Sequence, residues 1–222
     1  MLLPHVKICG ITRRQDALLC AEAGVGALGA VFYAKSPRCI EPAAARKLFE
    51  GLDPQIARVG IFVNASVDFM VRTARIAALD VVQMHGEETT EKIEAVRREG
   101  FHVVQALKRT GPELLAAARA LPPRVGILVE CGRGALPGGN GLAWNWSKAA
   151  PLAPFRAFAI AGGLNPQNLA AVARDSRAAG FDASSGVEIS PGIKDEAAVR
   201  AFLRAARDLP PAPQPFSWKG AP

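Results

Sequence analysis

The sequence contains few of the residues that build metal centres, disulfide frameworks or stacking surfaces. Only four of its 222 residues are cysteines, and aromatic residues make up 6% of the chain, with a single tyrosine. The cysteines are so widely and irregularly spaced that no pair has the spacing of metal ligands, and a disulfide framework is not expected. We therefore expect reduced thiols, no bound metal and a cytoplasmic protein. The four are Cys9, Cys20, Cys39 and Cys131.

Long apolar runs are also absent. No stretch approaches the roughly 20 residues that a membrane-spanning helix needs, and the first residues lack the basic and apolar regions of a secretory signal. The formal net charge is +7, but the basic residues are scattered through predicted helices. Nucleic-acid surfaces usually combine a basic stripe with stacking aromatic side chains. We expect no membrane or nucleic-acid partner, and a small phosphorylated substrate suits the charge better.

Half of the residues are apolar, and many of them gather in short, nearly continuous runs. Such runs are typical of parallel strands that are buried on both faces. Segments with helical periodicity lie between them. The predicted strands are 6–9, 27–33, 57–63, 80–84, 102–107, 125–130, 156–161 and 180–184, and the predicted helices are 13–24, 67–79, 90–99, 112–121, 166–178 and 196–208, with a short one within 144–152.

Eight strands that alternate with helices, at about 28 residues per unit, predict one closed (β/α)₈ barrel, the TIM barrel of the α/β class. A doubly wound open sheet is the alternative. No linker divides the chain, so we assign residues 1–209 to the barrel. Residues 210–222 are rich in proline, which predicts an extended or flexible C-terminal tail.

Polar side chains follow most of the predicted strands, where the catalytic groups of such a barrel lie. Cys9 ends the first predicted strand, just before Gly10. It is either a reactive thiol or a small buried hydrophobe, which most free cysteines are. The other candidates at strand ends are Lys35 to Arg38, Asn64, His85, Lys108, Glu130, Asp182 and Ser184 to Ser185.

Two glycine-containing turns follow the last two predicted strands. The first contains Gly162 and Gly163, and the second contains Ser185 and Gly186. Glycine lets backbone N–H groups approach an anion closely, and the loops after strands seven and eight of this fold often bind phosphate. One Gly-Gly pair alone is more often an ordinary tight turn. Two such turns at these positions favour a phosphate site.

Seven segments between residues 6 and 195 together resemble the phosphoribosylanthranilate isomerase family. The resemblance implies a (β/α)₈ barrel that works without metal or organic cofactor, as a monomer or homodimer. It also implies an Amadori rearrangement in tryptophan biosynthesis, in which N-(5-phosphoribosyl)anthranilate becomes 1-(2-carboxyphenylamino)-1-deoxyribulose 5-phosphate. The segments are 7–12 (KICGIT), 31–38 (VFYAKSPR), 59–64 (VGIFVN), 82–86 (VQMHG), 137–141 (PGGNG), 161–166 (AGGLNP) and 181–195 (FDASSGVEISPGIKD).

The resemblance also implies a role for each matching residue. A general acid opens the furanose ring of the substrate and a general base removes the proton at C2. By resemblance, Cys9 is the base, Glu130 is the acid and Arg38 holds the anthranilate carboxylate. The further substrate contacts are Lys7, His85 and Asp182, and the phosphate cradle is formed by Gly162, Gly163, Ser185 and Gly186.

The chain departs from the family pattern at two places. The family has an aspartate where this chain has Glu130, whose side chain is one methylene longer. Residues 138–142 and 144–146 read GGNGL and WNW, where the family tends to have GGTGK and FDW. Two other functions therefore stay open: a related isomerase that acts on another phosphoribosyl aminosugar, as in histidine synthesis, or a non-catalytic barrel that binds a phosphorylated ligand.

Overall fold

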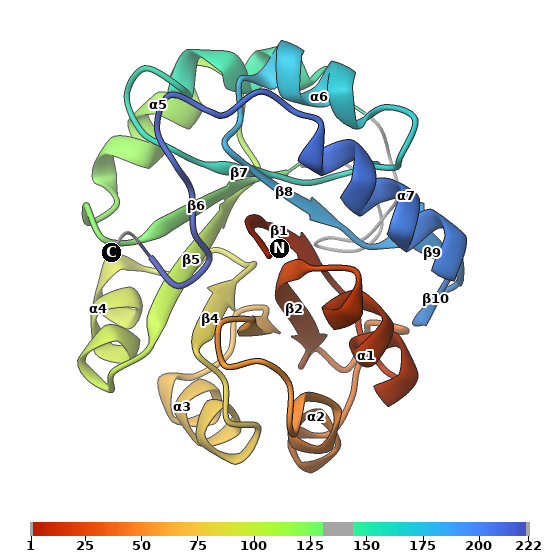
Figure 1. Cartoon of the computed structure of the whole chain (residues 1–222). Helices are drawn as coiled ribbons and strands as arrows, with labels where there is room; N and C mark the ends of the chain where they lie inside the picture. The colour runs from red at the N-terminus through yellow and green to blue at the C-terminus, as the bar shows by residue number, and fades with distance from the viewer. Residues whose placement is uncertain (1, 131–143, 221–222) are drawn as a thin grey trace.

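The computed structural model describes residues 2–130 and 144–220, so Cys131, the 137–141 motif and most of the altered loop lie outside the described residues. Eight parallel strands form a closed barrel in sequence order, with β1 hydrogen-bonded to β8, which confirms the predicted (β/α)₈ fold (Figure 1). The strands are β1 (Leu3–Ile8), β2 (Val25–Val31), β3 (Ala57–Phe62), β4 (Val81–Met84), β5 (His102–Leu107), β6 (Gly126–Val129), β7 (Ala159–Ile160) and β8 (Gly180–Ala183).

Helices surround the barrel, as Figure 1 shows. They are α1 (Arg14–Glu22), α2 (Pro42–Phe49), α3 (Val67–Ile76), α4 (Thr90–Arg98), α5 (Gly111–Ala120), the 3₁₀ helix η1 (Trp146–Leu152), α6 (Leu169–Ser176) and α7 (Glu196–Arg207). After β8 the chain forms a short 3₁₀ turn, η2 (Ser185–Val187), and a two-stranded hairpin of β9 (Glu188–Ser190) and β10 (Ile193–Lys194). Helix α2 was not predicted, because it has only eight residues and turns just three buried side chains toward the barrel.

Helix caps show where the sequence signals were sufficient. Ser66 accepts a hydrogen bond from the backbone of Phe69 and begins α3, as predicted. Asn165, the residue before the predicted helix 166–178, lies four residues before α6, and its side chain accepts from the backbone N–H groups of Gln167 and Asn168 in the turn ahead of the helix. Helix α6 therefore begins later than the predicted residue 166.

Two apolar layers form the core. The outer layer lies between strands and helices and includes Ile8, Phe62 and Phe202. The inner layer fills the barrel itself, and alanines supply several of its side chains, although bulky branched residues usually dominate this layer. The inner layer therefore needs bulk from elsewhere in the chain.

Two aromatic side chains of the C-terminal segment supply that bulk. Phe216 and Trp218 belong to the inner layer and are 7% and 1% exposed. In Figure 1 the segment that follows α7 crosses the end of the barrel over β6 and β5. The proline content of residues 210–222 predicts a flexible tail, but it hides the two aromatic residues that pack this segment against the barrel.

Candidate active site

One cavity opens at the carboxyl ends of the strands. Eight of the ten predicted site residues line it, whereas Lys7 and Gly186 do not. Side chains from β2, β3 and β4 complete its wall, so the two halves of the barrel both contribute. The predicted residues in the lining are Cys9, Arg38, His85, Glu130, Gly162, Gly163, Asp182 and Ser185, and the others include Tyr33, Ser36, Ile61, Gln83 and Leu164.

Cys9 stands at the end of β1, where the strand passes into the turn before α1. Its N–H donates to the carbonyl of Ala183 at 2.8 Å. A β-carbon on Gly29 of the neighbouring strand would lie 2.8 Å from the Cys9 Sγ, so glycine there makes room for the thiol. Burial raises the pKa of Cys9, and the positive charge of Lys7 opposes that rise. The thiol therefore depends on nearby cations to reach its reactive thiolate form.

Lys7 and Asp182 form a buried ion pair beside the thiol. They are register partners on β1 and β8, and the Lys7 Nζ lies 2.8 Å from the Asp182 Oδ2. Burial opposes the charged form of Lys7, but the charges of Asp182 and Cys9 raise its pKa overall. Burial raises the pKa of Asp182, against the influence of Lys7. The second oxygen, Oδ1, is buried and has no hydrogen-bond partner among the described residues.

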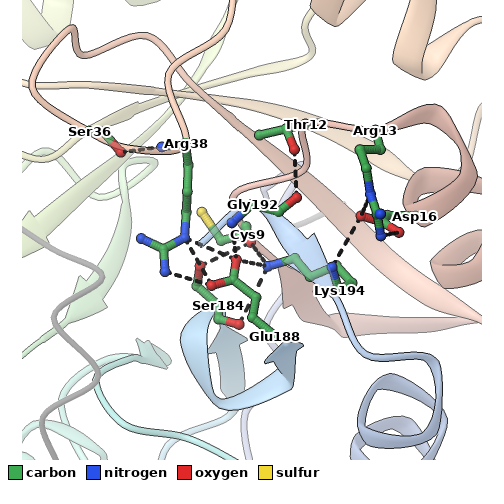
Figure 2. Close-up of polar contacts among 10 residues, drawn as sticks. All are labelled: Cys9, Thr12, Arg13, Asp16, Ser36, Arg38, Ser184, Glu188, Gly192 and Lys194. Atoms are coloured by element: carbon green, nitrogen blue, oxygen red, sulfur yellow. Dashed lines mark hydrogen bonds and ion pairs between the residues drawn. The ribbon is translucent and has the colours of Figure 1, made fainter. Parts of the chain in front are cut away.

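A second buried ion cluster holds Arg38 at the cavity wall (Figure 2). The Arg38 Nη2 and Nε bond to the Glu188 carboxylate at 2.6 and 3.0 Å, and the Lys194 Nζ bonds to the same carboxylate at 2.7 Å. Lys194 also donates to the Cys9 carbonyl at 2.5 Å. Burial opposes ionisation of Glu188, but the two cations lower its pKa overall. The cluster thus ties Arg38 to the strand end that carries Cys9.

Gly10 permits the close approach of Arg38. Its φ of +75° lies in the region that favours glycine. A β-carbon at this position would also collide with the Cδ of Arg38. The glycine after Cys9 is therefore required both for the turn and for the placement of the guanidinium.

Glu130 reaches across the cavity mouth to His85. Its Oε2 lies 2.6 Å from the His85 Nε2, and the Gln83 Nε2 lies 3.0 Å from the other ring nitrogen, Nδ1. With Gln83 donating to Nδ1, Nε2 carries the hydrogen and donates to the carboxylate. Lys108 donates to the His85 carbonyl at 2.6 Å. The longer side chain at position 130 is thus fixed by a residue from β4, two strands away.

The two glycine turns meet and present backbone N–H groups. Gly162 and Gly163 have φ values of +92° and +70°, and a β-carbon on Gly186 would collide with the carbonyl of Leu164. No hydrogen bond within the described part of the chain uses the N–H groups of Gly162 or Gly163. Gly186 packs closely on the first turn and does not line the cavity.

The carbonyl groups of the first glycine turn accept hydrogen bonds from two indoles and one side-chain amide. The Trp144 Nε1 donates to the Ala161 carbonyl at 3.0 Å, and the Trp146 Nε1 donates to the Gly162 carbonyl at 3.3 Å. The Asn168 side chain donates to the Gly163 carbonyl at 2.8 Å. Because these carbonyl groups are hydrogen-bonded to side chains, the N–H groups of the turn are left to face an anion.

Several of these residues have no role predicted from the sequence. Gln83, Glu188 and Lys194 stand inside the segments that carry the family resemblance, which was the signal available for them. Trp144 and Trp146 fall in the segment that departs from the family pattern. Their contacts show that this departing segment still holds the first glycine turn in place.

Comparisons with known proteins agree with this geometry. The profile of a family described as N-(5'phosphoribosyl)anthranilate isomerase matches residues 6–205. The N-(5'-phosphoribosyl)anthranilate isomerase of Myxococcus xanthus is 43% identical over 211 residues, which cover 92% of this chain and 97% of that protein.

Solved structures give the same result. The crystal structure of phosphoribosyl anthranilate isomerase from Thermus thermophilus superposes with a TM-score of 0.83 at 38% identity, covering 91% of this chain and 98% of that one. A second isomerase of this name, in complex with reduced 1-(o-carboxyphenylamino)-1-deoxyribulose 5-phosphate, has a TM-score of 0.79 at 33% identity and covers 93% of this chain and all of that one. This chain therefore belongs to the phosphoribosylanthranilate isomerase family.

Proposed function

We propose that this chain converts N-(5-phosphoribosyl)anthranilate into 1-(2-carboxyphenylamino)-1-deoxyribulose 5-phosphate, the isomerisation of its family, with Cys9 as general base and Glu130 as general acid. One observation carries the assignment: both side chains line a single cavity together with Arg38 and the glycine turns. A cavity of this composition offers an acid, a base, a carboxylate site and a phosphate site at once.

The substrate spans the cavity between its two anionic ends. The forked guanidinium of Arg38 suits the anthranilate carboxylate. The glycine turns at 162–163 and 185–186 suit the phosphate, and the unpartnered Oδ1 of Asp182 can accept a hydrogen bond from the sugar. Lys7 lies beneath the cavity and acts on the substrate through Asp182. His85 holds the acid in place.

Two proton transfers by the chain convert the substrate into an enol. Glu130 gives its proton to the furanose ring oxygen, the C1–O bond breaks and the anthranilate nitrogen forms an iminium with C1. The Cys9 thiolate then removes the proton from C2, and the electron pair of that C–H bond flows into the iminium. The resulting enol tautomerises to the ketone product. Because the iminium accepts the electrons, the chain supplies acid, base and positioning.

We also propose that the enzyme works in the cytoplasm as a monomer or homodimer, without a nucleic-acid or membrane partner. Cys9, Cys20 and Cys39 are free thiols, and proteins of reducing compartments usually keep their thiols free. In the described part of the chain, no helix is long and apolar enough to cross a membrane. Sedimentation at several concentrations would measure the oligomeric state.

Complementation of a tryptophan auxotroph that lacks this isomerase tests the function. The wild-type chain should restore growth, whereas Cys9→Ala and Glu130→Gln should not. Purified protein should turn over phosphoribosylanthranilate faster than the related ribotide of histidine synthesis. Growth restored by Cys9→Ala would contradict the role of the thiol, and a wild-type chain that binds the reduced product analogue without turnover would indicate a non-catalytic barrel.

A further inference from the structure

The C-terminal segment lies beyond the part of the chain that the family shares. The family profile ends at residue 205, and the segment 210–220 follows α7 without helix or strand of its own. It nevertheless packs at the amino-terminal end of the barrel, opposite the active-site cavity. The Lys219 Nζ donates to the carbonyl of Pro54, which precedes β3, and lies 3.5 Å from Asp80, which precedes β4.

The barrel interior at this end is lined by small side chains. Ala27, Ala159 and Ala179 contribute no more than a methyl group each, and Phe216 packs so closely on Gly180 that a β-carbon there would lie 2.6 Å from its ring. Phe216 and Trp218 meet edge to face, with ring centroids 5.2 Å apart. The two aromatic rings thus fill a space that the strands leave open.

The Trp218 ring faces a charged group that the active site uses. The Lys7 Nζ lies 5.0 Å from the centroid of this ring, within the range of a cation–π contact. On its other side the same ammonium group pairs with Asp182 at 2.8 Å. Lys7 and Trp218 are 0% and 1% exposed, so water does not reach the ammonium group from the amino-terminal end.

We propose that Trp218 is a positioning residue for the isomerisation. Its ring closes the barrel below Lys7 and holds the ammonium group against Asp182 and toward Cys9. The inference rests on the proposed role of Cys9 as the base. Burial raises the pKa of that thiol and the charge of Lys7 opposes the rise, so displacement of Lys7 leaves less thiolate at a given pH.

Trp218→Leu is the informative variant, because leucine keeps an apolar plug but removes the aromatic face. We expect kcat to fall about tenfold with KM within about twofold of wild type, since misplacement of a positioning group affects the chemical step most. The acidic limb of the pH–kcat profile should move to higher pH, because the thiol then needs a higher pH to ionise. Trp218→Phe restores an aromatic face and should recover kcat to within about threefold.

Phe202→Leu serves as the matched control. Phe202 is fully buried on α7 and belongs to the outer layer, whereas Trp218 belongs to the inner layer. The control should lower the unfolding midpoint in urea as Trp218→Leu does, but leave kcat and the pH profile as in wild type. The positioning role is overturned if Trp218→Leu keeps the wild-type kcat and pH profile, or if Phe202→Leu loses as much kcat.

A readout without turnover separates this inference from the proposed function. Alkylation of the Cys9 peptide by iodoacetamide across pH, followed by mass spectrometry, reports the thiolate directly. The midpoint for Cys9 should lie at higher pH in Trp218→Leu than in wild type, even if the wild-type chain fails to isomerise phosphoribosylanthranilate. An unchanged midpoint would refute the positioning role whatever the activity.

Discussion

Replacement of Glu188 by glutamine should weaken both the fold and the binding of the substrate. Glu188 is 3% exposed by its side chain and joins two cations, Arg38 and Lys194, which are 7% and 0% exposed. Glutamine keeps the shape of the side chain but removes its charge. Arg38 and Lys194 are then left side by side without their shared anion.

The contacts give the magnitude. The carboxylate accepts from Arg38 at 2.6, 3.0 and 3.2 Å and from Lys194 at 2.7 Å. Removing the charge of one partner of a buried ion pair lowers the free energy of unfolding by about 3–5 kcal/mol. The amide oxygen of glutamine can still accept a hydrogen bond from one of the two cations. We therefore expect the free energy of unfolding to fall by about 3 kcal/mol, which a domain with about 5–15 kcal/mol of stability can tolerate.

The same substitution should raise KM about tenfold, because Arg38 is no longer held toward the anthranilate carboxylate, while kcat should fall by less. Urea unfolding and steady-state kinetics measure the two effects. Glu99→Gln is the control. The side chains of Glu99 and its partner Arg75 are 42% and 62% exposed, so their ion pair should contribute less than about 1 kcal/mol to stability. Equal stability losses in the two variants, together with an unchanged KM, would refute the positioning of Arg38 by Glu188.

The effect should also depend on pH. Because the cations lower the pKa of folded Glu188 below its ordinary value of 4.5, the cluster stabilises the fold fully above that value. The contribution is lost as the pH falls through the lowered pKa. The difference in unfolding free energy between wild type and Glu188→Gln should therefore be full at pH 7 and shrink below about pH 4.5.

Three further substitutions test the rest of the site. Gly10→Ala should cost about 1–2 kcal/mol of stability and raise KM severalfold, because its φ of +75° strains alanine and its β-carbon displaces Arg38; an unchanged KM would argue against that contact. Asp182→Asn should move Cys9 alkylation to lower pH, since the Asp182 charge raises the pKa of the thiol, and a move to higher pH would contradict the charge assignment. Glu130→Asp should lower kcat about tenfold to a hundredfold, because the shorter side chain gives up its 2.6 Å contact with His85, whereas a wild-type kcat would show that this contact is dispensable.

The barrel could be predicted because its strands are buried on both faces, which leaves continuous apolar runs in the sequence. Strand limits were less certain: β1 begins at Leu3 rather than at residue 6, and β7 is only two residues long. Helix α2 could not be predicted, since an eight-residue helix with three buried side chains has little periodic pattern.

The site was predictable where one residue type marks a function, as a strand-end thiol or a pair of glycines does. Ion pairs between distant residues leave no such mark. Arg38 and Glu188 are 150 positions apart in the chain, and only the closed barrel brings them together. The contacts of Trp218 are also with residues far away in the chain. The sequence therefore places it in a proline-rich tail, although the small side chains of the barrel interior require a large partner.

Glu130 shows how the cavity can accept a longer side chain than the family pattern has. Position 130 follows β6, and His85 follows β4, so the carboxylate must cross the end of β5 to make its 2.6 Å contact. Gln83 fixes the far side of the imidazole ring at 3.0 Å, and Lys108 fixes its backbone carbonyl at 2.6 Å. The flexible glutamate side chain loses rotamer freedom when its end is bound in this way, and its carboxyl group then has a defined position in the cavity wall. The extra methylene is therefore accommodated as long as His85 stays in place. If this is correct, the effects of a Glu130 variant and a His85 variant on kcat should be strongly non-additive when the two are combined.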